Sequence, residues 1–245
     1  MIVLAIDTCE PRGSVAILKD DVILQVVAHT SAEEYSSWLL PAIDLALKSA
    51  KSTLAEVNVF AAASGPGSFT GVRIGLTTVK AWSEVFNKSI VAVSRLEAVA
   101  AQSHSQDPYV ASLIDAQRGQ IFGALYKRAA SELTLIDQEM VASPDVFLDW
   151  VDQQVAGNDQ QVAGNQVAWI STDPDALETH ATCKGRAARG EIQRVQPILA
   201  PLIGKIAFQR ASQGHLLDPL SVDANYVRRS YVEVFQKGPA HVPGK

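Results

Sequence analysis

The segment Ser64-Gly-Pro-Gly-Ser-Phe-Thr-Gly-Val-Arg-Ile-Gly75 constrains the fold more than any other part of this 245-residue chain. Its glycines allow the backbone to turn sharply and to approach neighbouring segments closely. An apolar run at 57–63 precedes it, and apolar residues recur at helical spacing over 72–87. We therefore expect a strand, a tight loop and a helix, with Ser68 or Thr70 as the cap of that helix, in a protein of the α/β class.

The chemistry of this loop has two interpretations. Free N–H groups at a helix start suit a phosphate, which Gly65, Gly67 and Ser68 would contact. The spacing matches neither a Walker A loop nor a G-x-G-x-x-G fingerprint, so simple tight packing is the alternative. Asp7, at the end of the first predicted strand, can likewise hold a magnesium-bound water or cap a turn, and the cap is the commoner role of Asp.

One of the next two predicted helices is a candidate for a subunit interface. Ser31-Ala-Glu-Glu34 has the form of a capping box, which predicts a helix over about 32–50, with Pro41 producing a kink or a restart. On the helix at 71–87, Gly71 and Gly75 share a face that another helix can approach. Packing within the chain is the alternative for that face, and we favour an interface. The predicted contact residues on this helix are Gly71, Arg73, Gly75, Thr78 and Trp82.

The remaining elements follow from apolar alternation, helical spacing and turn residues. Strands are predicted at Ile2–Asp7, Ser14–Leu18, Val22–Ala28, Ile90–Val93, Val110–Asp115, Gln120–Lys127, Leu133–Ile136, Val167–Ser171 and Ile192–Gln196, and helices at 95–102, 144–153 and 197–213. The polar break at 103–108 predicts two lobes, 1–104 and 105–245. The seven residues 152–158 are repeated at 159–165, which we interpret as a duplicated surface loop.

Composition limits the function classes. A hydrophobic content of 47% and a mean hydropathy of +0.08 predict a packed core. With a net charge of −5, the chain has no overall positive field that would attract nucleic acid. Short basic runs such as Arg228-Arg229 usually mark a solvated face. Two isolated cysteines suit a reducing compartment, and the N-terminal apolar run is too short for a membrane span. We expect a cytoplasmic protein.

No catalytic constellation emerges from the motifs. The five histidines have no H-x-x-H or H-x-x-x-H spacing, and Ser68 is not in a G-x-S-x-G nucleophile elbow. Without further information, neither a metal site nor a nucleophile can be assigned.

Five motifs occur in the order found in the TsaB (YeaZ) family, which this chain resembles over nearly its whole length. They are Asp7-Thr8, Ser64–Gly75, Val93-Ser94, Ile114-Asp-Ala-Gln-Arg-Gly119 and Tyr226-Val-Arg228. The resemblance implies the actin-like ATPase fold, with two lobes that each contain a mixed sheet flanked by helices. It also implies that the final helix, at about 197–213, packs back on the first lobe.

The resemblance further implies a function. TsaB-like proteins pair with the related TsaD subunit, which transfers a threonylcarbamoyl group to adenosine 37 of tRNAs that read codons beginning with A. TsaE, an ATPase, joins the assembly. The resemblance also implies that the helices at 32–50 and 71–87 form the subunit interface, which adds Tyr35, Trp38 and Leu39 to the predicted contact residues. TsaD-like paralogues carry a metal-binding H-x-x-x-H motif whose two histidine positions correspond to Arg95 and Val99 here. The chain is then a non-catalytic subunit that binds no cofactor itself, forms a homodimer when alone and meets tRNA only through the complex, while ATP and a metal ion belong to its partners.

An independent enzyme is the alternative, either a phosphotransferase that uses Asp7 and the glycine loop or a glycoprotease-like enzyme of the same superfamily. The sequence also departs from many relatives at Glu34-Tyr35-Ser36, where a histidine often precedes the Leu-Leu-Pro segment, and in the duplicated loop.

Overall fold

The structure is a computed structural model that describes residues 1–30, 33–129, 132–158, 167–177, 192–216, 222–224 and 227. Several sequence predictions lie outside these residues. They concern Ser31 of the predicted capping box, the second copy of the repeat at 159–165, and the Tyr226 and Arg228 positions of the last motif.

The first sheet combines antiparallel and parallel pairs. Its strands are β1 (Ile2–Asp7), β2 (Ser14–Lys19), β3 (Val22–Ala28), β4 (Val59–Ala63) and β5 (Ser89–Val93). Their order is β3-β2-β1-β4-β5, in which β1 is antiparallel to β2 and parallel to β4. Every residue of β4 is buried, as expected for a parallel strand covered on both faces.

The second sheet has the same plan. Its strands are β6 (Tyr109–Gln117), β7 (Gln120–Ala129), β8 (Glu132–Ala142), β9 (Val167–Ser171) and β10 (Ile192–Arg194). Their order is β10-β9-β6-β7-β8, with antiparallel β6–β7–β8 and parallel β6–β9–β10 pairs. Strand β8 is much longer than the predicted 133–136, because its exposed and polar positions hide an edge strand from hydropathy patterns.

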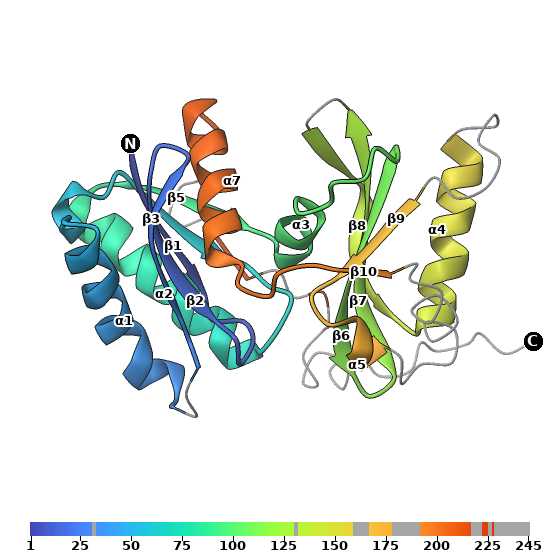
Figure 1. Ribbon diagram of the computed structural model, residues 1–245, viewed down its shortest axis with the longest axis horizontal. Coiled ribbons are helices and arrows are strands. Elements are labelled where there is room, and N and C mark those ends of the chain that lie inside the picture. The colour runs from blue at the N-terminus through green and yellow to red at the C-terminus, as the bar shows by residue number, and fades with distance from the viewer. Residues whose placement is uncertain are drawn as a thin grey trace, which may run out of the picture.

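Helices cover the sheets in layers (Figure 1). They are α1 (Tyr35–Ser49), α2 (Phe69–Phe86), α3 (Arg95–Ala100), α4 (Pro144–Asn158), α5 (Pro174–Leu177) and α7 (Ala200–Ser212), with a 3-10 turn at Leu54–Glu56. Helices α1 and α2 pack on one face of the first sheet and α7 packs on the other. Helix α3 packs on the inner face of the second sheet, and α4 covers its outer face. The α/β class with two mixed sheets is confirmed.

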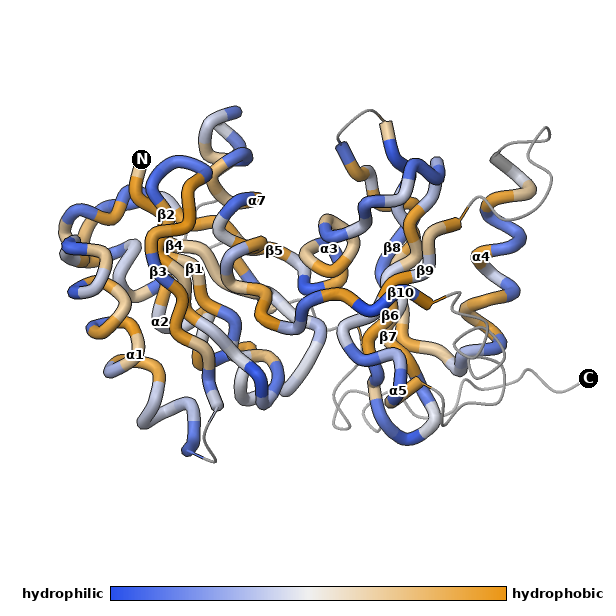
Figure 2. Tube along the Cα trace, in the orientation of Figure 1, coloured by the Kyte–Doolittle hydropathy of each residue, from blue (hydrophilic) through white to orange (hydrophobic). Residues whose placement is uncertain are grey.

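A single apolar core joins the two sheets. It runs from the first sheet through α7 and α3 to the inner face of the second sheet, where Val110 and Ile114 belong to it. Alternate residues of β6, Tyr109 and Leu113, point to a separate outer cluster with Phe147 of α4. Figure 2 shows hydrophobic residues concentrated in the strands and hydrophilic residues in the turns between them.

The start of α1 differs from the predicted one. The helix begins at Tyr35, its N-cap is Glu34, and no side chain caps it, so the predicted start at 32 is wrong. It also continues through Pro41 to Ser49 without the restart that proline suggested. Helix α2 begins at Phe69, two residues before the predicted 71. The hydroxyl of Ser68, one of its two predicted caps, accepts a hydrogen bond from Gly71 N at 3.3 Å.

Candidate functional site

Asp7, predicted either to hold a magnesium-bound water or phosphate or to cap a turn, ends β1 and is fully buried. Its carboxylate Oδ1 accepts a hydrogen bond from Cys9 N at 2.9 Å, as in a turn-capping Asp. The other oxygen, Oδ2, lies 3.2 Å from Arg95 Nε. Both carboxylate oxygens therefore have partners within the chain.

Arg95, the first residue of α3, binds three segments at once. Besides Asp7, its Nη1 lies 2.5 Å from Glu10 Oε1 in the β1–β2 loop and 3.3 Å from the carbonyl oxygen of Pro66 in the glycine-rich loop. The backbone N–H of Arg95 also donates to Gly65 O at 2.7 Å. Only 1% of the arginine side chain is exposed. This arginine therefore fixes the end of β1 and both loops relative to α3.

The charges of this cluster stabilise one another. Burial disfavours the charged guanidinium, but Asp7 and Glu10 outweigh burial and raise the pKa of Arg95. Burial also opposes ionisation of Glu10, yet the charge and hydrogen bond of Arg95 prevail and lower the pKa of Glu10. The result is an internal ion cluster with one cation and two carboxylates.

The glycine-rich loop makes the contacts expected of tight packing. Ser68 N donates to Cys9 O at 2.7 Å, and a Cβ on Gly67 would overlap that same carbonyl oxygen. The loop thus lies directly against the β1–β2 loop. Of the two interpretations of this segment, packing is the one for which the structure supplies contacts. Gly67 and Ser68 remain exposed on their other side.

Gly71 and Gly75 do not face an open side of α2, so that part of the sequence prediction is wrong. Both are buried. A Cβ on Gly71 would overlap the carbonyl oxygen of Thr8, and one on Gly75 would lie 2.7 Å from Thr8 Oγ1. Thr8 Oγ1 in turn donates to Gly71 O at 2.6 Å. Only glycine fits at these two positions, because α2 packs closely against Thr8, the residue that follows β1.

Two more predicted contact residues belong largely to the interior. Leu39 is 2% exposed and lies in the core, so it offers no surface to a partner. The Tyr35 hydroxyl accepts from Gly13 N at 2.7 Å and donates to Glu10 O, which joins α1 to the β1–β2 loop. Burial raises the pKa of Tyr35 to about 12, so its hydroxyl stays protonated at neutral pH.

The other predicted contact residues are accessible to different degrees. Trp38 is half-buried against His29 and Tyr35, with ring centroids 4.9 and 5.7 Å away. Trp82 is half-buried and packs on the ring of Phe60. Thr78 is half-buried and Arg73 is exposed, and both line a cavity of about 470 Å³ between α1 and α2.

Sequence reasoning missed the most exposed apolar residues on these helices. Leu40 and Leu45 of α1 are 57% and 54% exposed, and Phe69 and Val85 of α2 are 46% and 74% exposed. Together with Arg73, whose guanidinium lies 3.7 Å from the Phe69 ring centroid, we call these residues the α1–α2 surface. The signal was available, because each helix carries more apolar residues than one buried stripe requires.

Neither a metal cluster nor a membrane helix is found in the part of the chain that the structure describes. No three His, Cys, Asp or Glu residues there are grouped to hold an ion. Val99, one of the two positions compared with metal ligands, is fully buried. No described helix is both long and apolar enough to cross a bilayer.

Comparison with known proteins shows the family to which this chain belongs. A family model described as TsaD, tRNA N6-adenosine threonylcarbamoyltransferase, matches residues 21–175. The tRNA threonylcarbamoyladenosine biosynthesis protein TsaB of Escherichia coli (strain K12) is 30% identical over 162 residues, which are 64% of this chain and 68% of that protein. The chain belongs to the TsaB family. The TsaB protein of Bacillus subtilis (strain 168) is 31% identical over 154 residues, which are 62% of this chain and 65% of that protein.

A solved TsaB-like structure has the same fold. YeaZ from Pseudomonas aeruginosa superposes with a TM-score of 0.65 at 22% identity, covering 92% of this chain and 99% of that chain. The sequence matches to these two TsaB relatives span 65% and 68% of those proteins' lengths.

Proposed function

We propose that this chain is a non-catalytic subunit in the biosynthesis of threonylcarbamoyladenosine in tRNA. In this proposal it binds a TsaD-type threonylcarbamoyltransferase, which modifies adenosine 37 of tRNAs that read codons beginning with A. The observation that carries the non-catalytic role is the Arg95 cluster. Its guanidinium forms ion pairs with both Asp7 and Glu10, the carboxylates of the β1 end and the β1–β2 loop.

The absence of a strong positive charge supports an indirect contact with tRNA. With a net charge of −5, the chain lacks the field that draws proteins onto nucleic acid. The partner subunits would then hold the tRNA, the ATP and the metal ion, and a TsaE-type ATPase would join the assembly. The cytoplasm, where tRNA is modified, is the expected compartment.

The α1–α2 surface is the proposed contact with TsaD. Exposed Leu40 and Val85 would be desolvated there, and the cavity beside Arg73 can accept a side chain from the partner. In the absence of TsaD, a second copy of this chain would cover the same surface and form a homodimer.

Co-purification with TsaD from the same organism tests this contact. The double variant Leu40→Asp, Val85→Asp is expected to reduce recovery of the complex at least tenfold, because it places two charges in an apolar interface. Val146→Asp is the matched control, since Val146 is 58% exposed on α4, which covers the outer face of the second sheet. Equal recovery of the complex with both variants would show that the α1–α2 surface is not the contact with TsaD. Light scattering of the chain alone should show the double variant as a monomer.

A genetic experiment tests the biosynthetic role itself. Deleting the gene should lower the threonylcarbamoyladenosine content of tRNA, and the Leu40→Asp, Val85→Asp variant should fail to restore it. Fully modified adenosine 37 in the deletion strain would remove the proposal. ATP hydrolysis by the purified chain that Asp7→Ala abolishes would favour the independent enzyme instead.

A further inference from the structure

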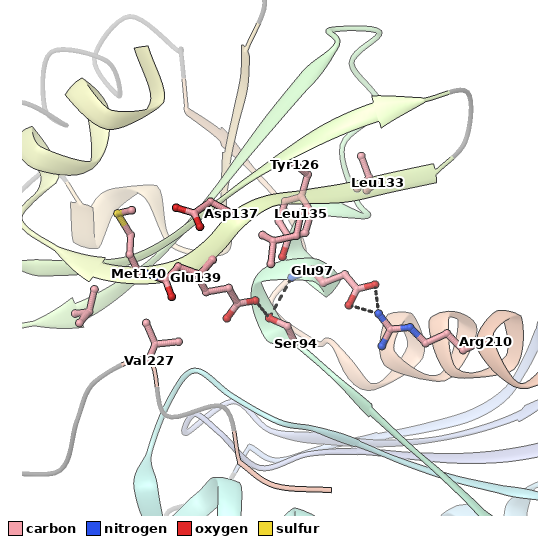
Figure 3. A pocket seen from close by; sticks show the side chains of 12 residues that line it. Ser94, Glu97, Tyr126, Leu133, Leu135, Asp137, Glu139, Met140, Arg210 and Val227 are labelled. Atoms are coloured by element: carbon pink, nitrogen blue, oxygen red, sulfur yellow. Dashed lines mark hydrogen bonds and ion pairs between the residues drawn. The ribbon is translucent and has the colours of Figure 1, made fainter. Parts of the chain in front are cut away.

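A cavity of about 810 Å³ opens between α3, β8 and the C-terminal half of α7 (Figure 3). Two acids of its lining are bound by other parts of the chain. Arg210 Nη2 lies 2.7 Å from both carboxylate oxygens of Glu97, and the Ser94 hydroxyl donates to Glu139. These contacts connect α3 to α7 and to β8, so the polar groups here hold packed elements together.

His29, the residue that follows β3, is a buried titratable side chain that the proposed function does not use. Only 7% of it is exposed. Its ring Nδ1 lies 2.7 Å from the carbonyl oxygen of Pro11 in the β1–β2 loop. Its Nε2 lies 2.8 Å from the carbonyl oxygen of Glu33, two residues before α1. The ring therefore bridges the β1–β2 loop and the segment that leads into α1.

Both atoms that the ring faces are hydrogen-bond acceptors. A carbonyl oxygen has no hydrogen to donate, so each contact needs an N–H on the ring. A neutral imidazole has one N–H, and an imidazolium has two. Only the protonated ring can therefore bind Pro11 and Glu33 at the same time, because the neutral ring turns a lone pair toward one of the two oxygens.

Aromatic side chains of α1 enclose the ring. The ring centroids of Tyr35 and Trp38 lie 4.7 and 4.9 Å from that of His29, and the Tyr35 hydroxyl is neutral. Water has little access to such a site, so a hydrogen bond that the ring loses is not simply replaced by one to solvent. Loss of one proton from His29 should thus move the chain and not only the ring.

The charged groups around His29 are mostly acidic. Those next to its contacts, in the β1–β2 loop and before α1, are Glu10, Arg12, Glu33 and Glu34. Arg12 lies 3.3 Å from Asp173, and the Arg95 cluster, which holds Glu10, has two carboxylates for one cation. Farther along α1, Asp44 and Lys48 pair with each other. An imidazolium at this position would offset part of the negative charge.

The start of α1 depends on these contacts, because no side chain caps the helix. Glu33, just before the N-cap, is bound by His29. Tyr35, the first helical residue, is bound through its hydroxyl to Gly13 N and Glu10 O. If either carbonyl contact of His29 opened, the first turn of α1 would be held against the β1–β2 loop by the tyrosine alone among these groups.

We propose that His29 is a proton-dependent clamp on the first turn of α1. As an imidazolium it binds the carbonyl groups of Pro11 and Glu33 together and fixes that turn, which carries Tyr35 and Trp38. When it loses one proton, one of the two contacts opens and the turn loosens. Where the clamp concerns TsaD it rests on the proposed function: since α1 forms part of the α1–α2 surface, TsaD binding should weaken as the pH rises through the titration of His29.

Nitrogen NMR of the full chain, labelled at its histidine rings, tests the clamp between about pH 5 and 9. The signals of His29 are those that His29→Gln removes. At low pH both ring nitrogens should carry hydrogen, and one should lose it as the pH rises. The amide signals of Gly13 and Tyr35 should shift with the same midpoint, because both residues adjoin the contacts that open. His215→Asn, which changes an exposed histidine after α7, should leave this transition in place.

Two NMR results would overturn the clamp. One is a His29 ring that carries a single N–H over the whole pH range. The other is a titration of His29 that the amide signals of Gly13 and Tyr35 do not follow. Both are read from the wild-type chain, and assignment through the neighbouring protons of Trp38 serves if His29→Gln does not fold.

Calorimetric titration with TsaD from the same organism tests the regulation at the two ends of the His29 transition. The dissociation constant of the wild type should rise about fivefold or more at high pH. His29→Gln should not show this rise, because glutamine donates to one carbonyl at every pH, and any pH dependence left in that variant belongs to TsaD. Equal pH dependence of the two proteins would contradict the regulation. If TsaD binds neither protein at any pH, the proposed function fails, and the NMR transition still decides the clamp.

Discussion

At the scale of single residues, the buried guanidinium of Arg95 joins the end of β1, the β1–β2 loop and the glycine-rich loop. It contacts Asp7 and Glu10, which precede it by 88 and 85 positions in the sequence. Removing one partner of a buried ion pair leaves uncompensated charge, which costs more than the intact pair contributes. The cluster therefore makes strong and specific predictions for stability.

Arg95→Met should lower the free energy of unfolding by roughly 3–5 kcal/mol, because it leaves the Asp7 and Glu10 carboxylates without their cation. Lys48→Met is the control, since it breaks an ion pair with Asp44 whose side chains are 73% and 61% exposed. Exposed pairs of this kind contribute about 0.5 kcal/mol or less. Urea unfolding measures both, and equal losses in the two variants would contradict the role of the cluster.

The pH dependence of stability gives a second test of the same cluster. The pKa of Glu10 lies below its ordinary value of 4.5 in the folded chain, so its stabilising contribution is present above that value and disappears as the pH falls through the folded pKa. In Arg95→Met, Glu10 loses the charge and hydrogen bond that do most to lower its pKa, while burial still opposes its ionisation, so its stabilising contribution becomes smaller. Acidification from pH 6 to 4 should therefore destabilise Lys48→Met more steeply than Arg95→Met. Parallel slopes would show that Glu10 does not depend on Arg95.

At the scale of secondary-structure elements, the approach of α2 to the end of β1 depends on two glycines. Gly71→Ala should destabilise the protein by roughly 1–3 kcal/mol, because the new methyl group overlaps the Thr8 carbonyl and α2 must move. Gly157→Ala in α4 is the matched control, since nothing lies within 4 Å of an added Cβ there. That variant should be neutral or slightly more stable, owing to the helix propensity of alanine. Thermal unfolding measures both variants. An equal change in melting temperature for Gly71→Ala and Gly157→Ala would contradict the close contact between α2 and Thr8.

At the scale of the whole molecule, α7 follows the second sheet in sequence but packs on the first. Its residues belong to the core that continues through α3 to the second sheet. Arg210 adds an ion pair with Glu97 of α3. Since one core spans both sheets, the intact protein should unfold in a single transition.

Gly204→Leu should divide that transition into two. An added Cβ at this position overlaps Leu18 Cδ1 and lies 3.3 Å from Ala5 Cβ, so a larger side chain would push α7 off the first sheet. The outer cluster of the second sheet does not depend on α7 and should melt separately. Lys205→Leu, which changes the neighbouring exposed position of α7, is the control. A single calorimetric transition in Gly204→Leu would contradict the view that α7 couples the sheets.

Local patterns in the sequence predicted the type and order of nearly all elements that the structure describes, because strand alternation and helical spacing depend on neighbouring residues only. It also identified the family through the Ser64–Gly75 segment and the motifs around it. Ser68, one of the two predicted caps of α2, followed from the same local rules. The edge strand β8, whose polar residues face solvent, was much underestimated, and the short helix α5 and the 3-10 turn at Leu54–Glu56 were not predicted.

The tertiary structure alone decided which faces are buried and which charges meet. Helical spacing placed Gly71 and Gly75 on one face of α2, but only the position of Thr8 against that helix shows that the face is internal. In the same way, comparison with TsaD-like sequences showed only that Arg95 replaces a metal-binding histidine. The fold shows that Arg95 forms an ion pair with Asp7. Such pairings join residues far apart in the chain, and their energies depend on desolvation, which exists only once the sheets and helices have packed.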